Sequence, residues 1–278
     1  MKNTTARALS VKTGMASLIF GAVLSSAPLM AQAPPAALQA AVTGAQRPAA
    51  DKARDQYRHP AETLAFLGVK PDATVVEIFP GGGYWTEILA PYLREHGHYI
   101  AAVGGHSDGL KAFTDKYTAK PDVYGKITVV ALDPPSALTL APAGSADFVL
   151  TFRNFHNWMK AGTTDAVFGA FAAALKPGGF LGVEEHRAST TKPQDPKAES
   201  GYVREDFVIA LAKKAGFSLV GQSEVNANPK DTKDYAKGVW TLPPTLRLGE
   251  QDKAKYVAIG ESDRMLLLFR KDLAAAKP

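Results

Sequence analysis

The hydrophobic pattern from residue 51 onward alternates between short apolar runs and stretches with a helical repeat. Short β-branched runs predict buried strands, whereas apolar residues three or four positions apart predict helices. Strands are predicted at residues 74–79, 99–103, 126–131, 147–152, 180–184, 217–225 and 265–270. Helices are predicted at residues 51–66, 85–93, 109–117, 164–175 and 203–215. This alternation predicts an α/β fold, in which helices cover both faces of a mostly parallel sheet.

The last two predicted strands differ from the others, because no helical pattern separates them and they are expected to pair antiparallel. The segment between them, residues 226–263, is long for a loop in a compact domain, and such loops are often functional. It contains Trp240, Pro243 and Pro244. We therefore expect this segment to form an ordered lid or a wall of the substrate site.

Residues 1–31 have the pattern of a secretory signal peptide. A basic start without acidic residues precedes an apolar run at 15–30, and small residues follow near Ala31. The alternative is an uncleaved membrane anchor, which the interruption of the run by Pro28 disfavours. Either topology leaves the rest of the chain outside the cytoplasm, so we expect a periplasmic or secreted protein. Residues 32–50 are rich in alanine, proline and glutamine and are predicted to be a linker.

Composition excludes several classes of function. The chain of 278 residues contains no cysteine, which excludes disulfides, thiolate zinc sites, iron–sulfur ligation and a cysteine nucleophile. The formal net charge is +5, but removing the leader leaves 29 basic and 27 acidic residues, a net charge of +2. A charge this small does not indicate a nucleic-acid surface. We expect a small-molecule substrate, no nucleic acid and no stable membrane insertion once the leader is cleaved.

A glycine-rich turn joins a predicted strand to the next helix in the segment VVEIFPGGGYWTEILA, residues 75–90. Glycine lets the backbone approach a ligand closely, and the free N–H groups at a helix start bind carboxylates and phosphates. The alternative is a tight strand–helix connection that binds nothing. The nicotinamide dinucleotide motif fits less well, because Thr86 stands where its third glycine belongs.

Three later segments follow this turn in order: ITVVALD, SADFVLTFRNFHNW and ALKPGGFLGVEEHR. Together the four segments resemble the class I S-adenosylmethionine-dependent methyltransferases, and most closely a bacterial group of predicted exported methyltransferases. The resemblance covers residues 51–272 of the domain at 51–278. It implies a Rossmann-like sheet of seven strands with an antiparallel last strand, in agreement with the pattern above. It also implies S-adenosylmethionine as cofactor.

The resemblance assigns cofactor contacts by position. The residues expected to contact the cofactor are Glu77, Gly81, Gly82, Gly83, Tyr84 and Asp133. Glu77 and the glycines would line its methionine part, and Asp133 would meet the adenine amine. Tyr84 stands at the start of the following helix, where it is expected to touch the cofactor as well.

The sequence departs from the family pattern at two places. Phe79 stands where the family has its first glycine, and Pro80 follows it. The second strand ends in Gly104 and Gly105, where the family supplies an acid for the ribose hydroxyls, and the next acid is Asp108. One or two missing hydrogen bonds in a buried pocket cost roughly 1–3 kcal/mol, so we expect weaker cofactor binding rather than none.

Candidate catalytic residues lie where predicted strands end, which is where ligands bind in open α/β sheets. His156 follows the strand at 147–152 on a predicted loop. Glu184 ends the strand at 180–184, and His186 lies just after it. Because the pKa of an unperturbed histidine is near neutrality, His156 is the first candidate for a general base. The alternative is that each histidine only hydrogen-bonds a neighbouring loop.

Strand alternation predicts that Glu184 and His186 share one side of the sheet while Glu185 points to the other. The residues expected to contact the methyl acceptor are Asn154, Trp158 and Trp240. A site for a first-row divalent ion, built from the two histidines and a glutamate, is an alternative. The spacing matches no metal-binding signature, so we assign no metal ligand.

The leading hypothesis is therefore an exported enzyme that transfers a methyl group from S-adenosylmethionine to an unidentified small molecule. The cofactor is made in the cytoplasm, whereas the leader directs export. A second hypothesis follows from this tension, because a fold does not determine a function. It is an extracytoplasmic small-ligand-binding protein or a repurposed enzyme on the same fold, with or without a metal.

Overall fold

The computed structural model describes residues 1, 34–105 and 107–273. The chain divides into Met1–Ala31 and Gln32–Pro278, and the second part is the one described below. Its strands are β1 (Thr74–Ile78), β2 (His98–Gly104), β3 (Ile127–Leu132), β4 (Ala146–Phe152), β5 (Leu175–His186), β6 (Phe217–Ser223) and β7 (Arg264–Lys271). The predicted leader falls mainly on residues 2–33 and so lies outside the described residues.

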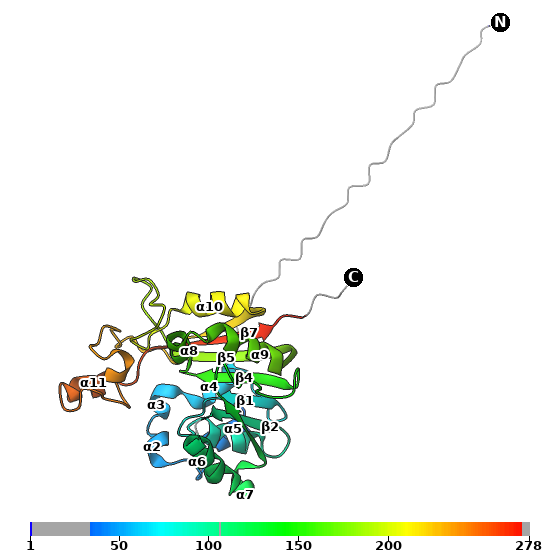
Figure 1. Cartoon of the computed structure of the whole chain (residues 1–278), viewed down its shortest axis with the longest axis horizontal. Coiled ribbons are helices and arrows are strands. Elements are labelled where there is room, and N and C mark those ends of the chain that lie inside the picture. Colours follow the sequence, from blue (N-terminus) through cyan, green and yellow to red (C-terminus); the bar gives the residue numbers. More distant parts are fainter. Residues whose placement is uncertain (2–33, 106, 274–278) are drawn as a thin grey trace. The chain divides into compact units, whose positions relative to one another are not determined.

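The strands form one seven-stranded sheet in the order β3-β2-β1-β4-β5-β7-β6 (Figure 1). The five strands β3, β2, β1, β4 and β5 are neighbours in this order, and each pairs with the next in parallel. Strand β7 lies between β5 and β6 and is antiparallel to both. The predicted sheet with an antiparallel last strand is confirmed.

One face of the sheet is covered by helices from the first half of the chain. They are α1 (Ala36–Thr43), α4 (Pro60–Phe66), α5 (Thr86–Leu93), α6 (Ser107–Thr118) and α7 (Pro121–Tyr124). Their apolar side chains share a core with Val75 of β1 and Leu150 of β4. Two short helices, α2 (Ala49–Lys52) and α3 (Asp55–Arg58), connect α1 to α4.

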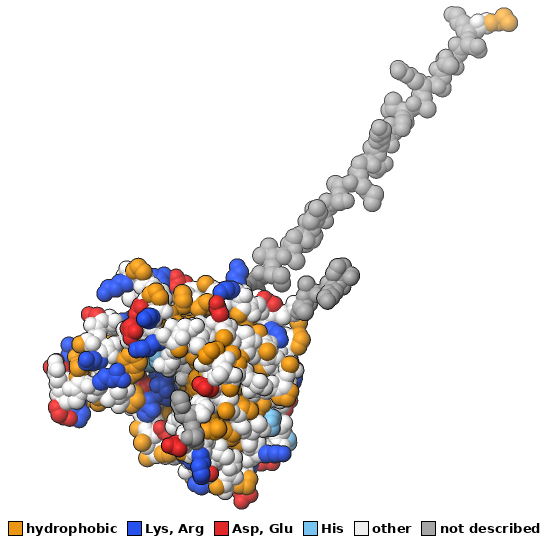
Figure 2. Space-filling view, in the orientation of Figure 1, with side chains coloured by type: hydrophobic (Ala, Val, Ile, Leu, Met, Phe, Trp, Pro, Cys, Tyr) orange, Lys and Arg blue, Asp and Glu red, His pale blue; other side chains and the backbone are white. Residues whose placement is uncertain are grey.

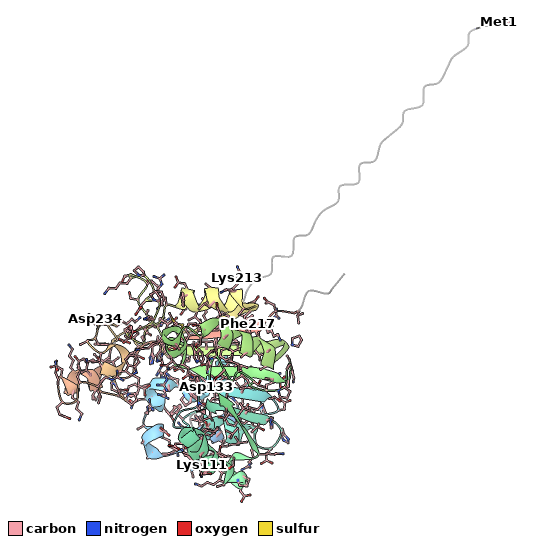
Figure 3. All side chains as sticks on the ribbon, in the orientation of Figure 1. Met1, Lys111, Asp133, Lys213, Phe217 and Asp234 are labelled. Atoms are coloured by element: carbon pink, nitrogen blue, oxygen red, sulfur yellow. The ribbon has the colours of Figure 1, made fainter. Side chains whose placement is uncertain are left out.

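The opposite face is covered by α8 (Phe155–Ala161), α9 (Thr164–Ala174) and α10 (Glu205–Lys214). Their apolar side chains share a second core with Val76 of β1 and Val149 of β4. Successive side chains of a strand point to opposite faces, which is why consecutive valines belong to different cores. Side chains fill the space between the sheet and both helix layers (Figure 3).

Helix α1 corrects one expectation, because it lies within residues 32–50, which were predicted to be a linker. Its alanine-rich sequence favours a helix. Leu38, Ala41 and Val42 recur at helical spacing and are buried in the core beside α4 and α5. This part of the presumed linker therefore belongs to the folded domain.

Other elements also differ from the prediction. The helix expected at 51–66 is divided, since His59 has a φ of 39° and ends α3 before Pro60 starts α4. His156 lies in the first turn of α8 rather than on a loop. The segment 226–263 is ordered, as expected, and contains a 3₁₀ helix, η1 (Gly238–Thr241), and α11 (Lys253–Ile259). Within the described ranges, no helix combines the length and apolar character needed to cross a membrane.

Candidate functional site

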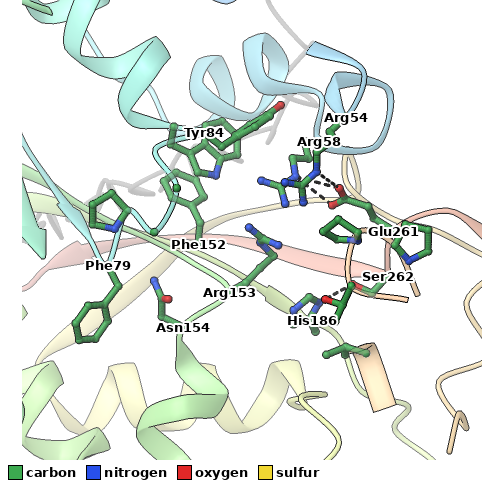
Figure 4. A pocket seen from close by; sticks show the side chains of 18 of the residues that line it. Arg54, Arg58, Phe79, Tyr84, Phe152, Arg153, Asn154, His186, Glu261 and Ser262 are labelled. Atoms are coloured by element: carbon green, nitrogen blue, oxygen red, sulfur yellow. Dashed lines mark hydrogen bonds and ion pairs between the residues drawn. The ribbon is translucent and has the colours of Figure 1, made fainter. Parts of the chain in front are cut away.

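A cavity of about 400 Å³ opens at the carboxyl ends of β1, β4 and β5 (Figure 4). Residues from α2 and α3, the β1–α5 turn, the start of α8 and the segment after β6 form its walls. The surface is hollowed between the segment carrying α11 and helices α2 and α3, with basic side chains in the hollow (Figure 2). Predicted site residues that line the cavity are Glu77, Gly81, Gly82, Tyr84, Asn154, His156, His186 and Trp240. Those outside it are Gly83, Asp133, Trp158 and Glu184.

Glu77 lies near the end of β1 with only 1% of its surface exposed. Its Oε2 atom accepts hydrogen bonds from the Tyr99 hydroxyl at 2.5 Å and the Thr86 hydroxyl at 3.1 Å. Burial outweighs these bonds and raises the pKa of Glu77 to about 7. The Oε1 atom is left for a ligand, and a cationic group bound there would favour the charged carboxylate.

Gly83 was expected to contact the cofactor, but it does not line the cavity. Packing within the domain explains why this position is a glycine. Its φ is 96°, and a Cβ atom at this position would lie 1.6 Å from the hydroxyl oxygen of Tyr117. That hydroxyl donates to Oε1 of Glu87 at 3.2 Å, which ties α6 to α5. Gly81 and Gly82 do line the cavity, and a Cβ at either would meet no atom of the described residues within 4 Å.

Asp133 is exposed and lies outside the cavity, contrary to the expected contact with adenine. The chain turns back at this residue through paired backbone hydrogen bonds with Ala137, and the carboxylate accepts a bond from the Ser136 hydroxyl at 3.1 Å. A Cβ at Gly105 would lie 3.1 Å from the Cβ of Asp133. The acid is therefore beside the end of β2, but its side chain faces solvent.

Phe79 has a φ of 47°, in the left-handed region that glycine adopts most readily. A φ in this region strains residues that have a side chain. The Phe79 ring lies 3.6 Å from where a Cβ of Gly104 would be and lines the cavity. It therefore covers the end of β2, which is the place where the family resemblance locates the ribose.

His156 and Glu185 form a hydrogen-bonded pair at the start of α8. The Nδ1 atom of His156 lies 3.1 Å from Oε1 of Glu185, and its backbone N–H donates to Oε2 at 3.2 Å. Glu185 is fully buried, and the histidine is 7% exposed at the cavity wall. We assign the proton to Nδ1, since the carboxylate accepts it, which leaves Nε2 as the nitrogen available to a ligand.

Glu184, predicted as a catalytic partner, points to the opposite face of the sheet. It lies 3.3 Å from Nε of Arg264 and accepts a hydrogen bond from Asn226 at 3.2 Å. Helix α8 covers the face to which Val183 and Glu185 point, so strand alternation selects Glu185 as the partner of His156. Glu184 is therefore replaced by Glu185 in the candidate site.

His186 joins the same cavity, with its ring centroid 5.6 Å from that of His156. Its Nδ1 atom lies 2.5 Å from the Ser262 hydroxyl, and burial with the neighbouring positive charges lowers the pKa of His186 well below its usual range. Ligand atoms of His156, Glu185 and His186 lie within 4.8 Å of one another, a spacing that suits a metal ion. However, Arg153 is among the charges that lower the pKa, and positive charge also disfavours a divalent cation.

The predicted acceptor contacts separate into two groups. Asn154 and Trp240 line the cavity, although the Asn154 amide already donates to the Ile78 carbonyl at 2.9 Å. The Trp240 ring lies edge-on to His156 with centroids 5.7 Å apart. Trp158 does not line the cavity, contrary to the prediction that it contacts the acceptor. It is 3% exposed and packs in the core between α8 and α9.

Tyr84 lines the cavity, but its polar contacts are with arginines and an acid. Its hydroxyl donates to Asp55 at 2.6 Å, and the guanidinium carbon of Arg58 lies 4.4 Å from the ring centroid. Arg54, Arg58 and Arg153 also line the cavity and were not among the predicted site residues. The four-residue spacing of Arg54 and Arg58 in a helical segment was the one sequence signal that could have placed them together.

No protein-family model matches the chain, and no curated protein is significantly similar to it. Its fold is similar to that of a SAM-dependent methyltransferase from Aquifex aeolicus, with a TM-score of 0.55 and 15% identity over 83% of this chain and 96% of that one. It is also similar to CrArsM, an arsenic(III) S-adenosylmethionine methyltransferase from Chlamydomonas reinhardtii, with a TM-score of 0.54 and 16% identity over 88% and 76%.

The [4+2]-cyclase SpnF is similar in fold as well, with a TM-score of 0.54 and 14% identity over 81% of this chain and 82% of that one. Identities this low show a shared fold and nothing finer. The chain therefore has the Rossmann-like fold of the class I methyltransferases, and one protein of that fold is named for a different reaction.

Proposed function

We propose that this protein transfers a methyl group from S-adenosylmethionine to a small-molecule acceptor that remains to be identified. One observation carries the proposal: the Glu77 carboxylate with its glycine-rich turn and the His156–Glu185 pair open on the same cavity. The cavity lies at the carboxyl ends of the central strands, where ligands bind in such sheets. A methyltransferase fold surrounds it.

The cavity residues fit the methionine end of this cofactor. Glu77 has an oxygen free for an ammonium group, and Gly81 and Gly82 leave open space at the turn. The nucleoside end fits less well, since Phe79 covers the end of β2 and Asp133 faces solvent. Support for the cofactor therefore rests on its amino-acid end, and we expect a modest affinity.

When bound, S-adenosylmethionine supplies an electrophilic methyl group whose bond to sulfur breaks as the acceptor's bond to carbon forms. His156 Nε2 would take the proton from an acceptor hydroxyl, since Nδ1 is held by Glu185. The buried carboxylate fixes the orientation of the ring and stabilises the imidazolium that forms. Holding the acceptor in line with the methyl group is the other task of the cavity, and it can lower the barrier by several kcal/mol.

Calorimetric titration of the full chain with S-adenosylmethionine and with S-adenosylhomocysteine tests the proposal. We expect both compounds to bind, and Gly82→Val to weaken both because its side chain would occupy open cavity space. Gly109→Val is the matched control, since Gly109 also has open space around it but does not line the cavity. If neither compound binds, the alternative of a repurposed ligand-binding protein on this fold replaces the proposal.

We also propose that the protein acts outside the cytoplasm, on the basis of the leader pattern at residues 1–31. Cell fractionation with N-terminal sequencing would test this proposal. Mature protein in the periplasmic fraction, starting near Gln32, is the expected result. Full-length protein confined to the cytosol would contradict it and would remove the difficulty of cofactor supply.

A further inference from the structure

One wall of the cavity contains more arginines than acids. The cavity is lined there by Arg54, Arg58, Arg153 and Glu261. Arg264 and Glu184 lie outside the lining but interact with these residues, and we call the six residues together the arginine cluster. Figure 4 shows the guanidinium groups of Arg54, Arg58 and Arg153 converging beside Glu261. They come from the α2–α3 segment and the end of β4, which are far apart in sequence.

Glu261 takes most of the contacts in the arginine cluster. It accepts hydrogen bonds from Arg54 Nε at 2.7 Å, Arg58 Nε at 3.0 Å and Arg264 Nη1 at 2.7 Å. Burial opposes ionisation, but Arg58 and Arg264 hold the pKa of Glu261 down to about 2. This carboxylate is therefore charged at neutral pH and is shared among three cations.

The charges of the cluster do not balance. Four arginines face two glutamates, which leaves a surplus of two positive charges. Arg58 and Arg264 are no more than 1% exposed, so water does not solvate this surplus fully. Among the described residues, the other acids that line the cavity, Asp51 and Glu77, form no ion pair with these arginines. Buried charge without a partner is costly, so the surplus favours an anionic ligand.

Unused donors of the cluster identify the kind of anion. Among the described residues, Arg58 Nη1 and Nη2 and Arg54 Nη2 are buried and have no hydrogen-bond acceptor. Arg153 Nε is also buried and makes no hydrogen bond, since its ion-pair partner Glu184 Oε1 lies 4.0 Å away. Buried donors of folded proteins are nearly always paired. The planar fork of a guanidinium group matches the oxygens of a carboxylate or a phosphate, and bonds of this kind are strong. The missing partner is therefore an oxyanion.

We infer that the arginine cluster binds an oxyanion carried by the methyl acceptor, either a carboxylate or a phosphate group. The assignment to the acceptor rests on the proposed function. S-adenosylmethionine has one carboxylate but also a sulfonium and an ammonium group, so its binding adds positive charge and leaves the surplus uncompensated. The acceptor thus carries an anionic group for Arg58 and Arg153 and a nucleophile that reaches His156 on the same cavity.

Calorimetry on the full chain at low ionic strength tests this inference with inorganic phosphate, acetate and the neutral analogue acetamide. Low salt is needed because ions screen the attraction. Phosphate and acetate should bind in the absence of cofactor, and acetamide should bind at least tenfold more weakly. Arg153→Gln should weaken phosphate binding by roughly tenfold to a hundredfold, the effect of a lost bond between charged groups. Arg270→Gln is the matched control, because it removes an exposed arginine at the far end of β7.

The same variants titrated with S-adenosylhomocysteine separate the two sources of oxyanion. An Arg153→Gln variant that binds phosphate normally but loses S-adenosylhomocysteine would assign the cluster to the cofactor carboxylate and overturn the inference. Equal binding of phosphate to wild type and Arg153→Gln would overturn it as well. If S-adenosylhomocysteine binds and phosphate does not, the inference fails while the proposed function stands. If phosphate binds and S-adenosylhomocysteine does not, the proposed function fails, and with it the assignment to an acceptor.

Discussion

Replacing Glu77 by glutamine should make the protein more stable at alkaline pH than the wild type. Glu77 is buried, and its only polar contacts among the described residues are the hydroxyls of Tyr99 and Thr86. Burial raises its pKa from 4.5 to about 7. Between these values the folded protein binds more protons than the unfolded chain, so the free energy of unfolding falls as the pH rises.

The magnitude follows from the two pKa values. Each unit of pKa is worth about 1.4 kcal/mol, so raising the pH from below 4.5 to above 7 removes about 3 kcal/mol of stability through Glu77. Glutamine keeps an acceptor oxygen for the tyrosine and threonine hydroxyls but has no charge to bury. Wild type and Glu77→Gln should therefore be similar in stability at pH 4 and differ by about 3 kcal/mol at pH 8.

Urea unfolding at a series of pH values measures this difference, because the other titrating groups are common to both proteins. Glu62→Gln serves as control, since it removes an exposed carboxylate on α4 and should keep the pH profile of the wild type. If the profiles of wild type and Glu77→Gln run parallel, burial does not hold the Glu77 proton and the reasoning is refuted. Calorimetry should also show weaker cofactor binding by Glu77→Gln, since the ammonium group would lose its anionic partner.

Three further substitutions have definite expected outcomes. Gly83→Ala should lower stability by roughly 1–3 kcal/mol in urea unfolding, because its Cβ would overlap the Tyr117 hydroxyl, whereas Gly82→Ala should not; equal stabilities would disprove the packing role. His156→Ala should lower turnover by about 10²–10⁴ with little change in cofactor affinity, and unchanged turnover would remove it as general base. Leu38→Ala should lower the free energy of unfolding by about 2–5 kcal/mol, because α1 is part of the core. If the variant is as stable as the wild type, α1 does not contribute to the core and the linker prediction stands.

The fold was largely predictable from the sequence because its determinants are local. Each strand and helix leaves a periodic pattern within its own residues, and the order of these patterns restricts the topology. The alternation of strand and helix patterns and the absence of a recognisable helical pattern between the last two strands predicted a parallel sheet with one antiparallel strand. The structure does place the short helix α11 in that interval, so the topology was right although the helix was missed. Helix α1 escaped detection because its alanines and one leucine gave a weak apolar pattern.

The sequence by itself therefore determined the α/β class, the placement of the candidate residues at the carboxyl ends of the strands and the approach of His156 to His186. Tertiary structure decided that Glu185 and not Glu184 holds His156, because the choice depends on which face of β5 helix α8 covers. Tertiary structure also decided that Asp133 is exposed to solvent and does not line the cavity. The arginine cluster draws its members from distant segments, so only the packing of the chain brings their charges together. Such charges interact through space, and apart from the four-residue spacing of Arg54 and Arg58 no local pattern records which of them will meet.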